Sequence, residues 1–420
     1  MNPWLIIRAS LRRYRLSALA FVLLIAAGTS LSVAIVSQER ALRTGSARAA
    51  DRFDLVVAAP GSRTDALLTS VFLQPGSARL MSPAATARLL NETEATFVSP
   101  LAFGDNIRGA PIVGVTAPLV EHLSGGLAEG RPFRSRQEAV IGSASPLKVG
   151  QTFRPAHGAA STGHNDHDHE EHEDEDRAAE GTHGHDRHPV ELTVVGRMKP
   201  TGSPWDRAVT VPVELVWDTH GLPSGHPEGS DQIGAPFDPA RTPGIPAAVV
   251  HVRSVASAYK LRQAYSTNES MAFFPAEALI QLYAIVGDVR QLMSVLAVIT
   301  QALVLLAILA SVFILLRLLM PQYVTLRALG APRSYIFLTA WGFMAALVTA
   351  GVATGLVGGY GLSLGISRWL SSQTGIALTP SLGTFEILMA LAIVAIGFAL
   401  ALLPALHLQR RPLAEALARF

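Results

Sequence analysis

The chain contains no cysteine, which excludes disulfides, thiolate metal sites and cysteine nucleophiles. Charge is also scarce: 16% of the 420 residues are Asp, Glu, Lys or Arg, whereas soluble domains carry about 25%. Only 3 of the 34 basic residues are lysine, and the formal net charge is +2. No basic face is long enough to follow a phosphate backbone, so nucleic acid is not expected as a partner.

The motifs of common catalytic sites are missing as well. The sequence has no GxxxxGK[ST] loop for nucleotide phosphates and no HExxH. We therefore predict that the chain is not an enzyme, that it has no catalytic residue and that it does not bind ATP itself. The long apolar stretches also lack the ionisable residues that mark proton or ion paths, which argues against an ion-coupled carrier.

What the sequence does contain is long uncharged runs, and the mean hydropathy is +0.33. A bilayer core about 30 Å thick needs roughly 20 apolar residues in a helix. Four stretches meet this length: residues 16–38, 291–316, 334–367 and 387–406. The sequence therefore predicts a membrane protein whose fold class is an α-helical bundle of four transmembrane helices, with a large α+β domain inserted between the first two.

The arginines predict the orientation. Arg8, Arg12, Arg13 and Arg15 precede the first span with no acidic residue among them, and the loop 317–334 is also purely basic. By the positive-inside rule, both termini and this loop are cytoplasmic. Residues 1–15 read as an amphipathic helix lying on membrane lipid. A cleaved signal peptide is the alternative for the first span.

The predicted organisation follows from these spans. Residues 39–290 form an external domain, 368–386 an external loop and 407–420 a cytoplasmic tail. Transmembrane helices occupy 16–38, 291–316, 335–367 and 387–406. Within the external domain, strand-like runs cover 53–59, 110–116, 139–142, 190–198, 208–213 and 247–252, and helix-like runs cover 83–92, 255–266 and 275–286. The last of these is expected to continue into the second span as a stalk, or else to be a rigid anchor.

Residues 157–188 differ sharply from their surroundings. They hold 8 of the 13 histidines and 10 acidic residues but only 2 arginines, a composition that predicts a disordered insertion. Imidazole and carboxylate together suit Zn²⁺ or another divalent metal, although no firmly bound cofactor is expected. A merely solvating loop is the alternative. The candidate metal ligands are His164, His167, His169, His172, His183 and His185.

The third apolar stretch is rich in glycine. Gly351, Gly355 and Gly359 recur at intervals of four, a spacing that lets helices approach closely in a bilayer. Packing within the chain and a seam between two copies are both open readings.

Three segments, beginning at the basic loop, carry distinctive sequence motifs. Residues 325–337 read TLRALGAPRSYIF, residues 351–363 read GVATGLVGGYGLS, and the tail 403–417 reads LPALHLQRRPLAEAL. These segments resemble the FtsX-like permease family. The external runs DLVVAAPGS, GRPF, EAVIGS, LKVGQTF and VVGRMKPTGSPWDRAVTVPVELVW are similar to MacB-type periplasmic domains of ABC permeases. The family's closing motif often has a small residue where this chain has His407.

The resemblance implies the permease subunit of an ABC transporter in a bacterial inner membrane. It implies a separate ABC ATPase subunit, a homodimer, transmission of ATP-driven motion to the periplasmic domain, and a periplasmic or outer-membrane partner. Export or handling of a hydrophobic, lipoprotein or toxic cargo is the expected role, with a link to divalent metal. The alternatives are a scaffold that activates a periplasmic partner and a metal-responsive receptor. The ATPase contact would fall on Arg327, Gly330, Ala331, Arg333 and Ile336; an ordinary basic turn is the competing reading.

Overall fold

A computed structural model describes residues 3–76, 79–107, 109–157, 190–285 and 287–410. The chain divides into two compact units, each considered by itself. The helical unit comprises Met1–Thr44, Val286–Ser372 and Leu378–Phe420. The mixed unit comprises Gly45–Ile285 and Gln373–Ala377. The predicted metal ligands between His164 and His185 lie outside the described residues.

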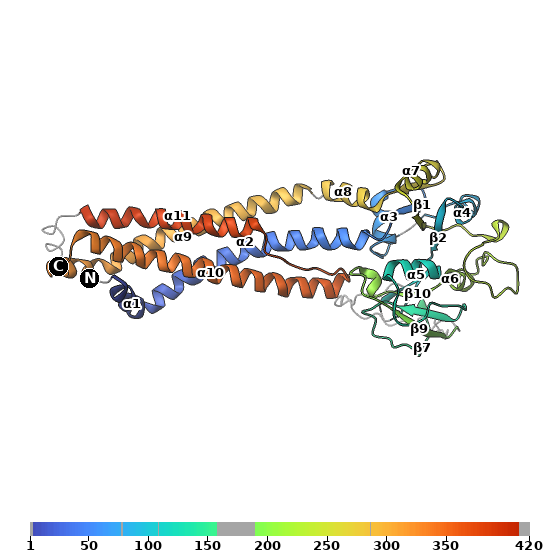
Figure 1. Cartoon of the computed structure of the whole chain (residues 1–420), viewed down its shortest axis with the longest axis horizontal. Coiled ribbons are helices and arrows are strands. Elements are labelled where there is room, and N and C mark those ends of the chain that lie inside the picture. The colour runs from blue at the N-terminus through green and yellow to red at the C-terminus, as the bar shows by residue number, and fades with distance from the viewer. Residues whose placement is uncertain (1–2, 77–78, 108, 158–189, 286, 411–420) are drawn as a thin grey trace, which may run out of the picture. The chain divides into compact units, whose positions relative to one another are not determined.

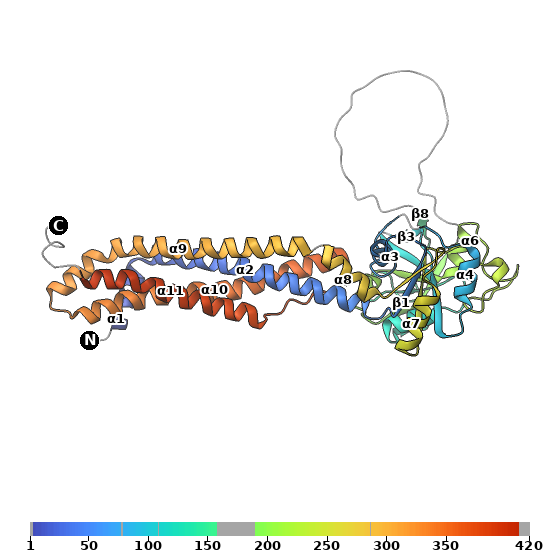
Figure 2. The same cartoon turned by 90° about the horizontal axis from the view of Figure 1, so that it is seen from above.

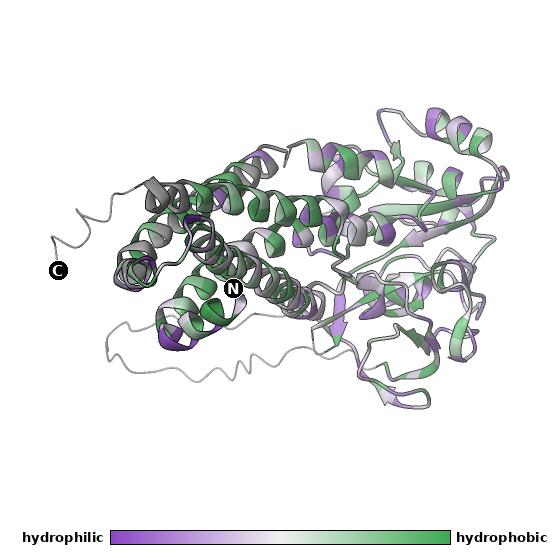
Figure 3. Ribbon diagram, turned by 60° about the vertical axis from the view of Figure 1, so that its left-hand side comes forward, coloured by the Kyte–Doolittle hydropathy of each residue, from purple (hydrophilic) through white to green (hydrophobic). Residues whose placement is uncertain are grey.

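Long apolar helices make up the helical unit. Figures 1 and 2 show that α1, the α9–α10 turn and the end of α11 lie at the same end of this unit, so α2 and α10 run away from it and α9 and α11 return. Figure 3 shows that these helices are mostly hydrophobic. The helix bounds are α1 Pro3–Arg13, α2 Arg15–Ala50, α9 Gly287–Ala328, α10 Arg333–Thr374 and α11 Thr384–Arg410.

Three of these helices are long and apolar enough to cross a membrane: α2, α10 and α11 over Thr384–Leu402. Among its described residues, α9 contributes a shorter apolar segment, Val298–Ala310. Three of the four predicted spans are thus present by length and composition, and the span in α9 stays a prediction. The core between the helices is built from Phe21, Ile25, Ile308, Phe343, Val348 and Ile393.

Helices extend beyond the uncharged runs at several places. Because α9 ends at Ala328 and α10 begins at Arg333, the basic loop predicted for 317–334 is reduced to a four-residue turn. α8 ends at Ile285 and α9 begins at Gly287, and residue 286 between them lies outside the described residues, so the expected continuous stalk stays a prediction. Charge marks where a helix leaves an apolar environment, and it does not end the helix.

Two β-sheets organise the mixed unit. Among the described residues, one sheet has the order β12-β1-β11-β2, and all its neighbouring strands are antiparallel. The other has the order β5-β9-β6-β10-β4-β3-β8, with β7 paired to β9, and contains the parallel pairs β10–β4 and β6–β9. The strands are β1 Leu55–Ala58, β2 Ala95–Leu101, β3 Asp105–Ile107, β4 Ala110–Val115, β5 Leu127–Gly130, β6 Glu138–Ile141, β7 Thr152–Phe153, β8 Ala156–His157, β9 Leu192–Met198, β10 Val209–Pro212, β11 Ala247–Val252 and β12 Met271–Phe273.

Short helices cover these sheets, and side chains from both sheets meet in the hydrophobic cores of the unit. One of these cores includes Val56, Val113, Val140 and Val249. This burial explains why the strand-like runs of the sequence become strands. The helices are α3 Arg63–Ser70, α4 Pro83–Leu90, α5 Ala117–Ser124, α6 Val213–Thr219, α7 Val255–Ala264 and α8 Pro275–Ile285, with 3-10 turns η1 Pro204–Asp206 and η2 Pro239–Arg241.

Candidate functional site

The α9–α10 turn (residues 329–332) has a well-defined backbone. Gly330 has a φ of 90°, its N–H donates to the Arg327 carbonyl at 3.1 Å, and the Ala331 N–H donates to the Leu326 carbonyl at 3.1 Å. These two bonds form a Schellman motif, in which a left-handed residue ends the helix. The Pro332 carbonyl then accepts the Ile336 N–H at 3.3 Å and opens α10. The chain thus reverses within four residues.

The structure brings the five predicted coupling residues together around this turn, but not with the same exposure. Gly330 and Arg333 are exposed, and Arg327 and Ala331 are half-buried. Ile336 is only 5% exposed and packs in the core of the helical unit. Ile336 therefore positions the turn, whereas the other four can reach a partner directly.

Sequence reasoning missed one residue of this turn. Leu329 is 80% exposed and directly precedes Gly330, whose φ is positive. A leucine with that exposure at the tip of a turn is suited to an apolar groove on a partner. The signal was present, because Leu329 interrupts an otherwise basic and small-residue segment.

The glycine stripe of α10 is used inside the chain. A Cβ placed on Gly351 would lie 2.8 Å from Ile25 Cβ, one on Gly355 would lie 2.9 Å from the Ala26 carbonyl oxygen, and one on Gly359 would lie 2.7 Å from the Ser30 carbonyl oxygen. These positions all face α2. Of the two readings left open by the spacing, the structure supports close packing of α10 on α2.

In the mixed unit, the sequence TGSPWDR forms a docking surface. Asp206 accepts the backbone N–H of Thr201 at 2.7 Å and of Gly202 at 2.8 Å, which folds the segment around η1. Trp205 is fully buried, and its indole N–H donates to the Val71 carbonyl at 3.2 Å. The motif is therefore a rigid, buried turn.

The docking segment, Gln373–Ala377, packs on this turn. Arg207 donates to the Gln373 carbonyl at 2.9 Å, and the Ala377 N–H donates to the Gly202 carbonyl at 3.1 Å. Ile376 packs against the same core as Trp205. Sequence analysis placed these residues in a loop separate from the external domain; the apolar Ile376 and the backbone bonds draw them into the mixed unit.

The mixed unit also holds an open pocket of about 850 Å³. Apolar and aromatic side chains supply much of its lining, and Arg207 adds a charge. Residues that line it include Phe72, Leu73, Phe103, Ile112, Trp217 and Leu222. A pocket of this size and character can take a hydrophobic molecule of moderate size.

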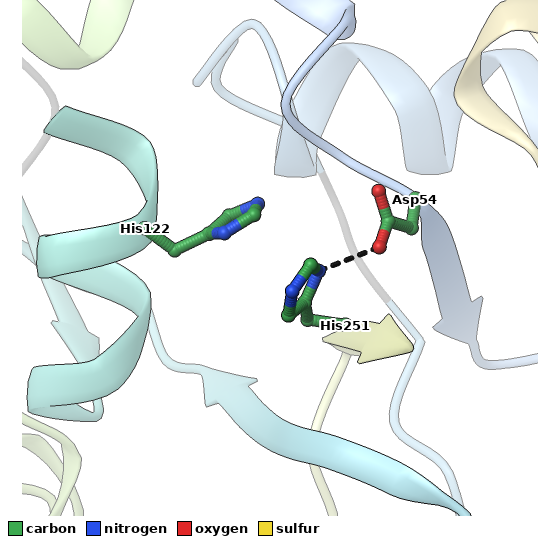
Figure 4. Close-up of side chains that lie close together, drawn as sticks. All are labelled: Asp54, His122 and His251. Carbon is green, nitrogen blue, oxygen red and sulfur yellow. Dashed lines mark hydrogen bonds and ion pairs between the residues drawn. The ribbon is translucent and has the colours of Figure 1, made fainter. Parts of the chain in front are cut away.

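One group of possible metal ligands occurs among the described residues: Asp54, His122 and His251 (Figure 4). Sequence reasoning missed it, because the three residues are far apart in the chain and none belongs to a recognisable motif. Only the fold shows that they are neighbours.

Known proteins supply further observations. Residues 294–413 match the family described as FtsX-like permease C-terminal. Among solved structures, the periplasmic region of MacB from Actinobacillus actinomycetemcomitans is 10% identical, with a TM-score of 0.31, and the match covers 57% of this chain and 95% of that one.

The extracellular domain of the noncanonic ABC-type transporter YknZ from Gram-positive bacteria is also 10% identical. Its TM-score is 0.26, and the match covers 52% of this chain and 98% of that one. No curated protein sequence matches. The family match covers both the α9–α10 turn and the glycine stripe, whose geometry is described above. Residues 294–413 are thus similar to the C-terminal domain of FtsX-like permeases.

Proposed function

We propose that this chain is the membrane subunit of an ABC system, in which a separate ATPase moves the mixed unit through the membrane helices. The observation that carries the proposal is the make-up of the mixed unit, which contains Gly45–Ala50 from the end of α2 and Gln373–Ala377 from the end of α10 and beyond. Two chain segments that continue membrane helices are thus packed into an α+β domain. Such segments suit the transmission of motion better than flexible tethers would.

The topology in this proposal has four crossings. The start of α1, the α9–α10 turn and the end of α11 share one end of the helical unit (Figures 1 and 2), and this arrangement requires an even number of passes. Arg8, Arg12 and Arg333 mark that end as cytoplasmic under the positive-inside rule. α9 then supplies the fourth crossing, and the mixed unit lies on the non-cytoplasmic side of a bacterial inner membrane.

The α9–α10 turn is the proposed contact with the ATPase. Its backbone is fixed by the Schellman motif, it exposes Leu329, and it carries Arg327 and Arg333 at its two sides. An exposed leucine flanked by arginines fits a partner groove that is apolar at its centre and acidic at its rim. A rigid turn loses little conformational entropy on binding.

The pocket next to the docking segment supports a role with hydrophobic cargo. Gln373 and Thr374 of the docking segment line it together with Phe72 and Trp217. Movement of the docking segment would therefore change the shape of the pocket. We propose that the cycle of the ATPase opens and closes this pocket toward a hydrophobic or lipidated molecule.

The test is affinity purification of the tagged full-length protein in mild detergent, with mass spectrometry of the proteins that accompany it. We expect an ATPase with a nucleotide-binding loop. Gly330→Val is then expected to lose that ATPase, because a β-branched residue at a φ of 90° is strained by roughly 1–2 kcal/mol and disturbs the turn.

Gly361→Val is the matched control, since a Cβ on Gly361 meets nothing within 4 Å and the residue lies in α10 away from the turn. Both variants should elute as folded protein on size exclusion. Recovery of the ATPase with Gly330→Val as efficiently as with Gly361→Val would contradict the proposed contact. A co-purifying periplasmic enzyme would instead favour a scaffold that activates a partner.

A further inference from the structure

Asp54, His122 and His251 come from three separate parts of the mixed unit. Asp54 directly precedes β1, His122 lies on α5, and His251 lies near the end of β11. One possible ligand atom from each residue lies within 4.8 Å of those of the other two, and all three residues are half-buried. Figure 4 shows the ring of His122 facing His251, with Asp54 on the other side of His251.

Hydrogen bonds fix which nitrogen of each ring carries a proton. His122 Nε2 lies 2.9 Å from the Arg52 carbonyl oxygen. A carbonyl can only accept, so Nε2 donates and Nδ1 of the neutral ring holds a lone pair. His251 Nδ1 lies 2.6 Å from Asp54 Oδ2, so by the same argument Nδ1 donates and Nε2 holds the lone pair.

This is the arrangement found around metal-bound histidines. Such residues almost always donate their second ring N–H to a backbone carbonyl or a carboxylate, which orients the ring and makes the other nitrogen a better ligand. Here one histidine uses the carbonyl and the other uses the carboxylate. The Asp54 oxygen also accepts the Val252 N–H at 3.3 Å, which holds the carboxylate in place.

The two histidine rings lie against each other and against an aromatic side chain. The two imidazole rings are 4.1 Å apart between centroids, and Phe97 packs against both, at 5.6 Å from His122 and 5.2 Å from His251. This packing holds the two imidazole rings next to each other.

The cluster is also accessible. Asp54 and His251 line an open pocket of about 520 Å³, together with Tyr259 and Phe274. Metal sites with three protein ligands or fewer keep positions for water or for an exchangeable ligand. The pocket supplies that room, and its aromatic wall gives the open side an apolar character.

We propose that His122, His251 and Asp54 form a binding site for a divalent transition-metal ion such as Zn²⁺, with the two imidazoles as ligands and the carboxylate as third ligand or as the group that orients His251. Zn–N bonds are 2.0–2.1 Å, so tetrahedral ligand atoms lie roughly 3.4 Å apart, and one possible ligand atom of each of the three residues already lies within 4.8 Å of the others. The ion would fasten α5 to the start of β1 and the end of β11. This site is independent of the proposed ATPase partner and of residues 158–189.

The test uses the full chain in detergent with residues 158–188 replaced by a short Gly-Ser linker, so that the histidines there do not contribute. Titration with Co²⁺, followed by visible absorption and by competition with Zn²⁺, should show one tight ion per chain. His122→Gln and His251→Gln should each weaken binding at least tenfold, and Asp54→Asn should weaken it roughly tenfold to a hundredfold. His220→Gln, a histidine of the same unit outside the cluster, should leave affinity unchanged.

A measurement on the unsubstituted linker protein avoids any dependence on variant folding. One equivalent of Cu²⁺ should give an electron paramagnetic resonance spectrum with two coordinated imidazole nitrogens. Fewer than two nitrogens would overturn the proposal. So would equal Co²⁺ affinity in the linker protein and in a folded His122→Gln/His251→Gln double variant.

Discussion

Two of the sequence motifs of the mixed unit are linked by a single ion pair. Arg131 belongs to GRPF and Glu138 to EAVIGS, and their side chains meet at 2.5 Å between Nη2 and Oε1. Glu138 also accepts the backbone N–H of Arg134 at 2.7 Å. These bonds close the segment between β5 and β6, so the two motifs are explained as one structural element.

Stability is expected to depend on pH through this pair. The hydrogen bond from Arg131, aided by the Arg134 N–H, lowers the pKa of Glu138 below its ordinary value of 4.5. A carboxyl whose pKa is depressed by folding stabilises the protein above the unfolded-state pKa, and this contribution is lost as pH falls through the folded-state pKa. Glu138→Gln should therefore lower the melting temperature by roughly 2 °C at pH 7 and should have no effect well below pH 4.5.

Thermal unfolding of the detergent-solubilised chain from pH 7 to pH 3 measures this. Glu129→Gln, at an exposed glutamate of strand β5 in the same sheet, is the control and should unfold like the parent at each pH. If Glu138→Gln lowers the melting temperature at the acidic end of this range as much as at pH 7, then packing, and not charge, accounts for the effect.

At the residue scale, sequence reasoning located candidate residues that lie close together in the chain. Arg327, Gly330, Ala331 and Arg333 are neighbours in the chain, and a helix end brings them together. It could not locate Asp54, His122 and His251, because only the pairing of β1 with β11 and the placement of α5 make them neighbours.

At the scale of elements, the contact between α2 and α10 depends on small residues. A Cβ on Gly355 would lie 2.6 Å from Thr29 Cβ and 2.9 Å from the Ala26 carbonyl oxygen. Ser30 Oγ also donates to the Gly355 carbonyl at 2.9 Å across the same contact. A methyl group on Gly355 therefore fits only if α2 and α10 move apart.

Gly355→Ala should therefore destabilise the helical unit by about 1–3 kcal/mol, the usual cost of overpacking a tight contact. Gly361→Ala is the matched control in the same helix, because its Cβ would meet nothing within 4 Å. It should be neutral or slightly stabilising, since alanine favours helix over glycine. Chemical or thermal unfolding in detergent gives both values. Equal stability of the two variants would remove α2 as the partner of the stripe.

Element boundaries show what a sequence pattern can and cannot give. α2 continues past the uncharged run to Ala50, because helix-favouring residues such as Glu39, Arg40 and Leu42 follow the run, and an i,i+4 ion pair joins Glu39 to Arg43. β2 was not among the predicted strands, and its Pro100 is a residue that argues against a strand. It is tolerated because β2 lies at the edge of its sheet.

At the scale of the whole molecule, the proposed function depends on the docking segment. Its Ile376 packs against the core that contains Trp205, and its backbone is bonded to Gly202. Ile376→Asp would place a charge against that core and should release the segment, while leaving the α9–α10 turn intact. ATP hydrolysis by the assembled complex should then persist while the mixed unit no longer responds to it.

The absence of cysteine makes the response measurable, because two introduced cysteines can be spin-labelled without background. Glu228→Cys, an exposed site in the mixed unit, and Leu382→Cys, an exposed site in the helical unit, report the distance between the units with and without ATP. The parent complex should show a nucleotide-dependent change that Ile376→Asp abolishes. Ile280→Asp, at an isoleucine of α8 that is 68% exposed, should retain it. A full distance change in Ile376→Asp would mean that the docking segment is not needed and that the other connections between the units, at Thr44–Gly45 and Ile285–Val286, carry the motion.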